Sequence, residues 1–215
     1  MSAILGRRIA GHLRLRIPQP MSPNRLFHGE LVRLAAPRPE DADAFSRWSE
    51  DGEYRRLADT DAPRPLPAEY FAERDELSEP RLDAFEFRIR TLEEDRLVGF
   101  VALFSIEWPN RHGWIAVGIG DPADRGRGFG KEAVSLSLRF AFHELGLRRL
   151  SLDVIADNPA AIALYRGLGF EEEGRLRERV YRDGVTSDLI YMGLLRREWE
   201  KTLSASSAGS AAGGG

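Results

Sequence analysis

The chain has 215 residues, of which 42% are hydrophobic and 30% are charged, and its formal net charge is −3. This balance fits one globular domain and excludes a global electrostatic attraction to nucleic acid or to anionic membranes. The chain has no cysteine, which excludes disulfides and thiolate metal sites, and no apolar run reaches the roughly 20 residues of a membrane-spanning helix, so we expect a soluble, cytoplasmic, metal-free protein.

Both ends of the chain are predicted to lie outside the folded domain. Residues 1–28 mix arginines with prolines and show no apolar period, which predicts a disordered leader. Residues 203–215 are almost only serine, alanine and glycine, which bury too little surface to offset the entropy of ordering, so we predict a disordered tail. The domain is then expected over residues 29–202.

The first half of this domain alternates strand and helix patterns. A strand is predicted at 31–34, a helix at 39–48 with acidic residues in its first turn, and a second helix at 67–77. Apolar residues alternate with charged ones over 85–89 and an apolar run fills 97–104, which predicts an antiparallel hairpin with its turn at 93–95. A further strand over 115–119 ends at Gly120.

The second half begins with the most strongly patterned helix. From Gly128 the apolar period becomes 3.6 residues, and Gly146 marks the helix end. A strand at 150–154, a short helix at 159–166 and a return strand near Phe170 follow. Two last strands, 175–181 and 187–195, flank Asp183-Gly184, a dipeptide that favours a tight two-residue hairpin turn.

Residues 124–132 read Asp-Arg-Gly-Arg-Gly-Phe-Gly-Lys-Glu and lie between a strand and this strong helix. Glycines allow backbone N–H groups to converge on an anion at the positive end of the helix dipole, so the segment is a candidate phosphate loop. A flexible connection is one alternative. A dinucleotide-binding turn is another, with Asp153 near the spacing of its acidic residue, but the glycines do not follow the first strand of a βαβ unit.

Two motifs resemble the GNAT N-acetyltransferase superfamily. Arg125-Gly-Arg-Gly-Phe-Gly130 matches its arginine/glutamine-x-x-glycine-x-glycine/alanine motif, and Asn158-Pro-Ala-Ala-Ile-Ala-Leu-Tyr165-Arg-Gly-Leu-Gly-Phe170 matches its second signature. The hairpin at Asp183-Gly184 and the segment 187–195 resemble the RimJ/RimL branch, which acetylates ribosomal-protein N-termini. The resemblance covers about residues 31–200.

The resemblance implies an α/β fold with a largely antiparallel, twisted sheet, whose splayed central strand pair is flanked by helices. It also implies an N-acetyltransferase that takes acetyl-CoA as co-substrate and acetylates a primary amine, in a small molecule or at a protein N-terminus. A non-catalytic coenzyme A binding module of the same fold is the alternative, and a dinucleotide-dependent oxidoreductase ranks below it. A homodimer is also considered.

The resemblance further implies roles for individual residues. The thioester oxygen is expected at the N–H of Gly118. Tyr165 is expected to protonate the leaving thiolate, with a structural tyrosine bonded to a backbone carbonyl as the alternative. Coenzyme contacts are expected from one strand end, one loop and one helix, namely Val117, Gly118, Ile119, Gly120, Arg125, Gly126, Arg127, Gly128, Phe129, Gly130, Lys131, Asn158, Ala161 and Tyr165, where Asn158 is also a typical helix N-cap.

The attacking amine must first lose a proton, because an ammonium group has no lone pair. Many GNAT relatives carry a glutamate near the start of the strand before the phosphate loop, whereas this sequence reads Arg-His-Gly-Trp at 111–114. Glu107 and His112 are weak substitutes for that base, and an ordered water is the alternative. Four aromatic residues are candidates for lining an acceptor pocket, with packing in the core as the alternative. They are Trp48, Tyr54, Trp108 and Trp114.

Overall fold

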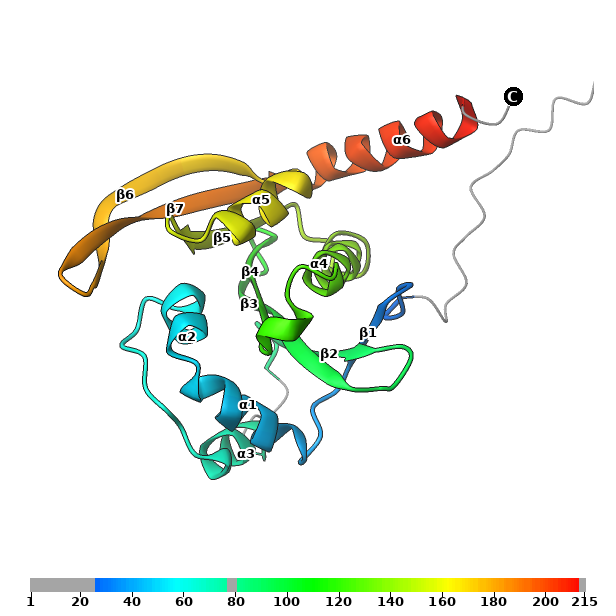
Figure 1. The fold of residues 1–215 in the computed structure, drawn as a ribbon. Coiled ribbons are helices and arrows are strands. Elements are labelled where there is room, and N and C mark those ends of the chain that lie inside the picture. The colour runs from blue at the N-terminus through cyan, green and yellow to red at the C-terminus, as the bar shows by residue number, and fades with distance from the viewer. Residues whose placement is uncertain (1–25, 77–80, 213–215) are drawn as a thin grey trace, which may run out of the picture.

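The computed structural model describes residues 26–76 and 81–212. Seven strands form one sheet in the order β1-β2-β3-β4-β5-β7-β6 (Figure 1). The strands are β1 (Val32–Ala35), β2 (Phe85–Thr91), β3 (Leu97–Glu107), β4 (His112–Ile119), β5 (Arg149–Ile155), β6 (Glu171–Arg182) and β7 (Val185–Leu195). The α-helices are α1 (Asp41–Glu50), α2 (Gly52–Ala58), α3 (Ala68–Glu76), α4 (Phe129–Arg139), α5 (Pro159–Gly167) and α6 (Arg196–Ala212).

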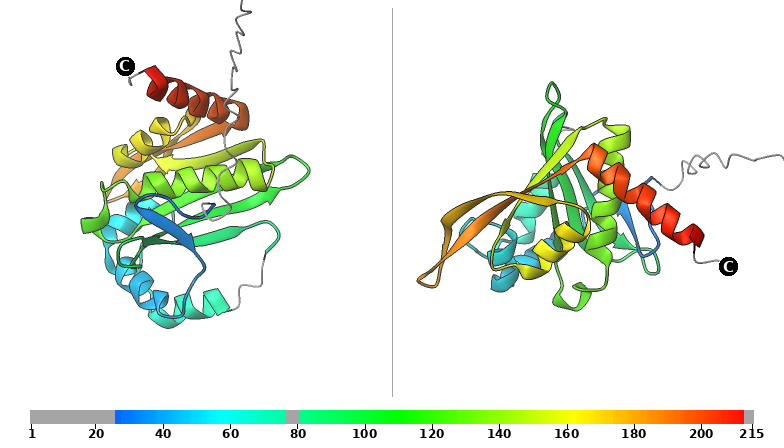
Figure 2. Two further views of the ribbon diagram at one scale, coloured as in Figure 1. Left: turned by 90° about the vertical axis from the view of Figure 1, so that its right-hand side faces the viewer. Right: turned by 90° about the horizontal axis from the view of Figure 1, so that it is seen from above.

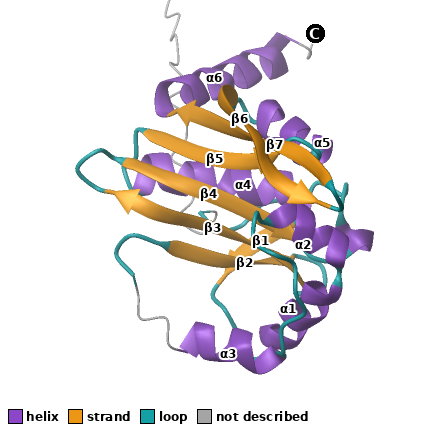
Figure 3. Ribbon diagram, turned by 90° about the vertical axis from the view of Figure 1, so that its left-hand side faces the viewer, coloured by secondary structure: helices purple, strands orange, loops and turns teal. Residues whose placement is uncertain are grey.

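The central pair β4 and β5 is parallel, and every other neighbouring pair is antiparallel. One face of the sheet packs on α4, which lies behind the strands in Figure 3 and in front of them in the left view of Figure 2. Val134 and Leu138 of α4 and Leu152 of β5 belong to this main core. Burial of such side chains contributes most of the driving force for folding. The expected α/β fold with a mostly antiparallel sheet is therefore confirmed.

A smaller core covers part of the opposite face. Phe45 and Trp48 of α1 and Phe71 of α3 pack together and against Phe100 of β3. Phe100 alternates with Val101, which points into the main core, as expected for a strand with period two. The helices α1 and α3 are thus attached to the face that does not carry α4.

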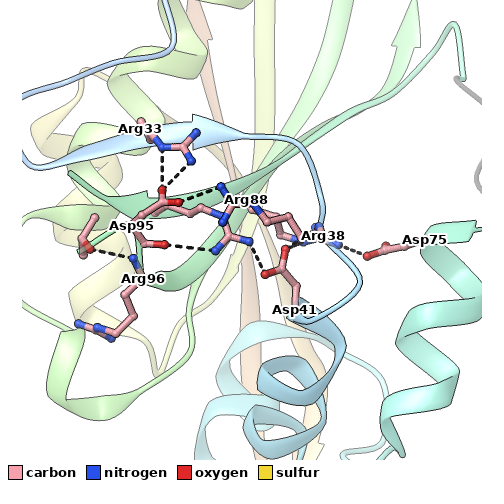
Figure 4. Close-up of polar contacts among 9 residues, drawn as sticks. Arg33, Arg38, Asp41, Asp75, Arg88, Asp95 and Arg96 are labelled. Carbon is pink, nitrogen blue, oxygen red and sulfur yellow. Dashed lines mark hydrogen bonds and ion pairs between the residues drawn. The ribbon is translucent and has the colours of Figure 1, made fainter. Parts of the chain in front are cut away.

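Ion pairs fix α1 and α3 to β2. Arg88 is buried, lies over the ring of Phe45 at 4.6 Å, and contacts Asp75 of α3 at 2.5 Å (Figure 4). Arg90 pairs with the buried Asp41 at the start of α1. A buried charge is tolerated only when it is paired, so these contacts specify where the two helices lie.

Most predicted elements appear where the sequence placed them, including the two-residue turn at Asp183 and Gly184, both of which have positive φ. The helix that begins after Gly128 ends in a π-helical turn, Phe140–Glu144, before Gly146 at φ 67°. The helix α2 was not predicted. Its first residue is a glycine, its interior carries three polar residues, and none of its residues is buried, so it has no apolar face to recognise.

Both domain boundaries differ from the prediction within the described residues. Phe27 packs on Phe87 and Phe140 at 5.4 and 5.6 Å, and His28 bridges to Arg33, so the fold includes part of the predicted leader. At the other end α6 continues to Ala212. Alanine is the best helix former and a helix propagates more easily than it nucleates, which explains the extension. Residues 1–25 of the predicted leader and 213–215 of the predicted tail lie outside the described residues.

Candidate active site

The strands β4 and β5 pair only at one end. Their register covers His112, Gly113 and Trp114 of β4, and no β4–β5 pairing is present from Ile115 to Ile119 among the described residues. The expected splay of the central strand pair is therefore present. The result is an opening in the middle of the sheet, bordered by the second half of β4.

Strand register decides which peptide groups border this opening. The N–H of Gly120 donates to the carbonyl of Val98 in β3, and the β3–β4 register continues without a shift through Phe100 opposite Gly118. In an antiparallel ladder alternate residues turn their N–H and C=O toward the same neighbour. Gly118 therefore faces β3, and the peptide groups of Val117 and Ile119 face the opening. The expected role of the Gly118 N–H at the thioester oxygen does not fit this register.

The predicted phosphate loop follows the end of β4. Gly126 and Gly128 have φ of 73° and 89°, and Gly128 is the N-cap of α4. These left-handed conformations are unfavourable for residues with a side chain. They turn the chain so that the first N–H groups of α4, from Phe129 onward, are available to an anion. Asp124 fixes the start of the loop, because its carboxylate accepts two hydrogen bonds from Arg96, at 2.6 and 2.8 Å.

The two arginines of the loop are already engaged. The Arg125 guanidinium donates to the carbonyls of Gly120 at 2.6 Å and Ile119 at 3.3 Å and pairs with Asp51 at 2.9 Å. We expected a phosphate contact from Arg125, whereas the structure gives its side chain protein partners. Arg127 is more exposed, contacts Asp124 at 3.3 Å and lies over the Phe129 ring.

The remaining features of the loop are those of a pyrophosphate cradle. Gly130 and the exposed Lys131 lie in the first turn of α4. Positive-φ glycines, a helix N-terminus and a nearby cation are what an anionic phosphate requires. The N–H groups of Val117 and Ile119, which have no partner among the described residues, offer the adjoining hydrogen bonds of an extra strand. The residues present therefore fit a phosphate-bearing ligand with an amide-containing arm, as coenzyme A is.

The helix α5 carries Tyr165 into the main core. Asn158 caps the helix, since its side chain accepts a hydrogen bond from the N–H of Ala161 at 3.1 Å, so its predicted N-cap role is confirmed. Tyr165 is buried in the main core, 5.7 Å from Phe170 between ring centroids. Burial, and secondly Asp153, raise the pKa of its hydroxyl. Among the described residues the hydroxyl has no hydrogen-bond partner, so the alternative of a backbone-bonded structural tyrosine lacks its partner.

Sequence reasoning missed one carboxylate at this site. Leu152 and Val154 of β5 point into the main core, so Asp153 between them points to the opposite face, where α2 lies. Burial and the charge of Asp59 raise the pKa of Asp153, while Arg179 opposes the shift. Asp153 forms no ion pair among the described residues. Its effect on the pKa of Tyr165 indicates that the two groups lie near each other.

The earlier candidates for the proton acceptor lie elsewhere. His112 starts β4 and contacts Ser151 at 3.0 Å and Glu107 at 3.9 Å, at the paired end of the two strands. A strand rises about 3.4 Å per residue, so His112 is roughly 17 Å from Val117. Glu107 lies opposite His112 in the β3–β4 register, at the same end of the sheet. Neither side chain borders the opening.

The four predicted aromatic residues have different environments. Trp48 covers the end of β4, since a Cβ on Gly120 would lie 2.0 Å from its ring. Tyr54 of α2 approaches Gly118. Trp114 packs 5.9 Å from Tyr191, and Trp108 donates to the carbonyl of Leu82. Trp48 and Tyr54 are thus the two that border the site.

A cavity of about 500 Å³ lies on the α2 side, between this helix and the β6–β7 hairpin. Its walls include Glu53 and Arg56 of α2, Asp157 after β5, and Arg182 and Asp183 of the hairpin. Arg56 pairs with Asp183 at 2.5 Å. The carboxylates of Glu53 and Asp157 form no ion pair among the described residues. Arg182 donates to the backbone carbonyls of residues 59–61, so the walls carry charges of both signs, and Glu53 and Asp157 are the wall carboxylates left to meet a positively charged ligand.

Comparisons with known proteins agree with this geometry. Residues 32–171 match the acetyltransferase (GNAT) domain. The chain belongs to the GNAT acetyltransferase family. It is 34% identical over 173 residues to a prophage-derived N-acetyltransferase of Bacillus subtilis strain 168, covering 80% of this chain and 94% of the relative. It is 30% identical over 135 residues to the spermidine N(1)-acetyltransferase of Vibrio cholerae, covering 62% and 78%.

The fold agrees with the same family. The crystal structure of spermidine N-acetyltransferase from Vibrio cholerae, in complex with CoA and spermine, superposes with a TM-score of 0.71 at 23% identity, covering 79% of this chain and 98% of that one. The chain is thus an acetyl-CoA-dependent N-acetyltransferase. In the described part of the chain, no group of three or more candidate ligands is placed to hold a metal ion, and none of the helices is long and apolar enough to cross a membrane.

Proposed function

We propose that this enzyme transfers the acetyl group directly to a primary amine, through the opening between β4 and β5. The observation that carries the proposal is the placement of Tyr165 and Asp153. Tyr165 belongs to the core that contains α4, whereas Asp153 points to the other face and lies close enough to affect the pKa of Tyr165. A donor for the leaving group and an acceptor for the amine proton thus flank one opening from opposite sides.

Val117 and Ile119 bind the coenzyme arm in this proposal. Their peptide groups continue the β4 ladder into the opening, and one of their N–H groups takes the thioester oxygen in place of Gly118. The N–H groups at the start of α4 and the side chain of Lys131 bind the pyrophosphate. Acetyl-CoA supplies the acyl group and a thiolate that leaves readily.

Asp153 and Tyr165 move the protons. The Asp153 carboxylate takes one proton from the ammonium group of the acceptor, which frees the lone pair on nitrogen. Its raised pKa makes it a better proton acceptor than an ordinary aspartate. The buried Tyr165 hydroxyl, whose pKa is raised, stays protonated and donates its proton to the departing sulfur, and the second proton that the nitrogen loses as the amide forms restores the phenol.

The acceptor is a cationic primary amine, bound in the cavity beside α2. Two wall carboxylates without ion pairs, Glu53 and Asp157, favour a positive charge there. The relative from Vibrio cholerae is named for spermidine, and the resemblance of the β6–β7 hairpin to the RimJ/RimL branch favours a protein N-terminus. Both acceptors carry the amine that the chemistry needs.

A panel of acceptors tests this function. The panel comprises spermidine, lysine and a short peptide with a free N-terminus, each incubated with acetyl-CoA and followed by thiol release and mass spectrometry. The same peptide with a blocked N-terminus is the control. We expect acetylation of at least one free amine and none of the control. Tight acetyl-CoA binding without transfer to any amine would select the non-catalytic coenzyme A binding module instead.

A further inference from the structure

Tyr54 is held in a fixed position relative to the phosphate loop. Its backbone N–H donates to Asp51 at 3.0 Å, and the same carboxylate pairs with Arg125 through its other oxygen at 2.9 Å. The Arg125 guanidinium lies over the Tyr54 ring, 5.3 Å from its centroid, and donates to the carbonyl of Gly120. Three residues from two distant segments therefore brace α2 against the end of β4.

This brace directs the Tyr54 hydroxyl to Gly118. A Cβ built on Gly118 would lie 2.5 Å from the Tyr54 oxygen, so only a glycine leaves room for the hydroxyl. Gly118 lies between Val117 and Ile119, whose peptide groups border the opening. Ile119 packs against the core that contains α4, so Gly118 and Tyr54 lie on the other face. The hydroxyl is thus at the rim of the opening, on the face to which Asp153 points.

The hydroxyl has no protein partner there. Among the described residues no hydrogen bond involves it, although burial raises the pKa of Tyr54 to about 12 and keeps it neutral. A hydroxyl that makes no hydrogen bond within the protein is free to donate to or accept from a ligand.

The ligand on this face is the amine rather than the coenzyme. The phosphate loop leads into α4, which covers the opposite face of the sheet (Figure 2), so the coenzyme approaches from there. We propose that Tyr54 positions the acceptor amine across the opening from Asp153, an inference that rests on the proposed function. As Asp153 removes one ammonium proton, the Tyr54 oxygen accepts a hydrogen bond from a remaining N–H. Two anchors of this kind direct the nitrogen lone pair toward the carbonyl carbon.

The variant Tyr54→Phe tests this role, because it keeps the ring over which Arg125 lies and removes only the hydroxyl. With the best acceptor of the three-amine panel, we expect kcat/KM for the amine to fall about tenfold, equal to about 1.4 kcal/mol. The dissociation constant of acetyl-CoA and its slow hydrolysis without amine should stay within twofold of wild type. The matched control is Tyr70→Phe on α3, which is 45% exposed and should change none of these values.

Each other outcome overturns the proposal. An unchanged kcat/KM in Tyr54→Phe, measured beside an active wild-type enzyme, refutes the role of Tyr54 and leaves the proposed function intact. An equal loss in amine-independent hydrolysis would place the hydroxyl on the acyl group, and a weaker acetyl-CoA affinity would make Tyr54 part of the coenzyme site. Absence of transfer by the wild-type enzyme would refute the proposed function and this inference together.

Discussion

Arg125 and Asp51 form an ion pair at 2.9 Å that joins the phosphate loop to the corner between α1 and α2. Asp51 is also the N-cap of α2. One carboxylate therefore stabilises a helix start and orients the loop arginine. The loop proposed to bind the coenzyme and the helix that lines the proposed acceptor cavity meet at this pair.

The variant Asp51→Ala should lower the free energy of unfolding by about 1–2 kcal/mol, mostly through loss of the N-cap. Asn caps a helix as well as Asp does, so Asp51→Asn should lose only the ion pair, about 0–1 kcal/mol. The hydrogen bond from Tyr54, and then Arg125, lower the pKa of Asp51. Its charge thus stabilises the fold above the unfolded pKa near 3.8, and the difference between wild type and Asp51→Asn should disappear as pH falls below that value. Urea unfolding across this range measures it, and a difference that persists at lower pH would argue against the pair.

The variant Gly128→Val should weaken acetyl-CoA binding at least tenfold, about 1.4 kcal/mol. A β-branched residue is strained at φ 89°, and a Cβ there would lie 3.2 Å from Leu31. Both effects displace the loop from the phosphates. Gly52→Ala, where a Cβ meets no atom within 4 Å, is the control for the calorimetric titration. Equal affinities of Gly128→Val and wild type would remove this loop from the site.

The variant Tyr165→Phe should lower kcat about 10- to 100-fold, since a thiolate needs less acid assistance than poorer leaving groups. The Michaelis constant for acetyl-CoA should barely change. Because the hydroxyl has no partner among the described residues, the melting temperature should also stay near that of wild type. Steady-state kinetics beside a melting curve tests both points. Full activity of Tyr165→Phe would refute the role of Tyr165 as general acid, and a clear loss of stability would indicate that its hydroxyl is structural.

The variant Asp153→Asn should lower kcat/KM for the amine about 100-fold, the low end for a general base. In wild type, kcat/KM should rise with pH along an acidic limb. The apparent pKa of this limb should lie above the ordinary aspartate pKa of 3.8, because burial and the charge of Asp59 raise the pKa of Asp153. Asp153→Asn should lose that limb. Asp43→Asn, an exposed carboxylate of α1, should keep it. A pH–rate profile with the same limb in both variants would assign the base to another group.

The sequence could predict the elements whose signals are local. The glycines of the phosphate loop, the Asn158 cap and the Asp183-Gly184 turn each act through neighbouring residues, and their elements appear as expected. The role of Arg125 could not be predicted, because its partner Asp51 lies 74 residues away. Cytoplasmic location, the homodimer and the coenzyme contacts stay predictions.

The direction of peptide groups was also beyond sequence reasoning. Glycine at 118 suggested an accessible N–H, but whether that group faces β3 or the opening depends on strand register. Asp153 was missed for a related reason, because a carboxylate in a strand borders an opening only where the neighbouring strand diverges. The direction of the Gly118 N–H and the position of Asp153 both follow from how β4 pairs with its neighbours.

Amide hydrogen exchange tests the central claim that the coenzyme arm fills the opening along β4. The N–H groups of Val117 and Ile119 should exchange more slowly when acetyl-CoA binds, because they gain hydrogen bonds. Those of Ala116 and Gly118, already paired with β3, should change little. Residue-resolved exchange by NMR, with and without acetyl-CoA, measures all four. Slower exchange at Val117 and Ile119 alone is the predicted result, and unchanged exchange at both, despite saturation with acetyl-CoA, would contradict it.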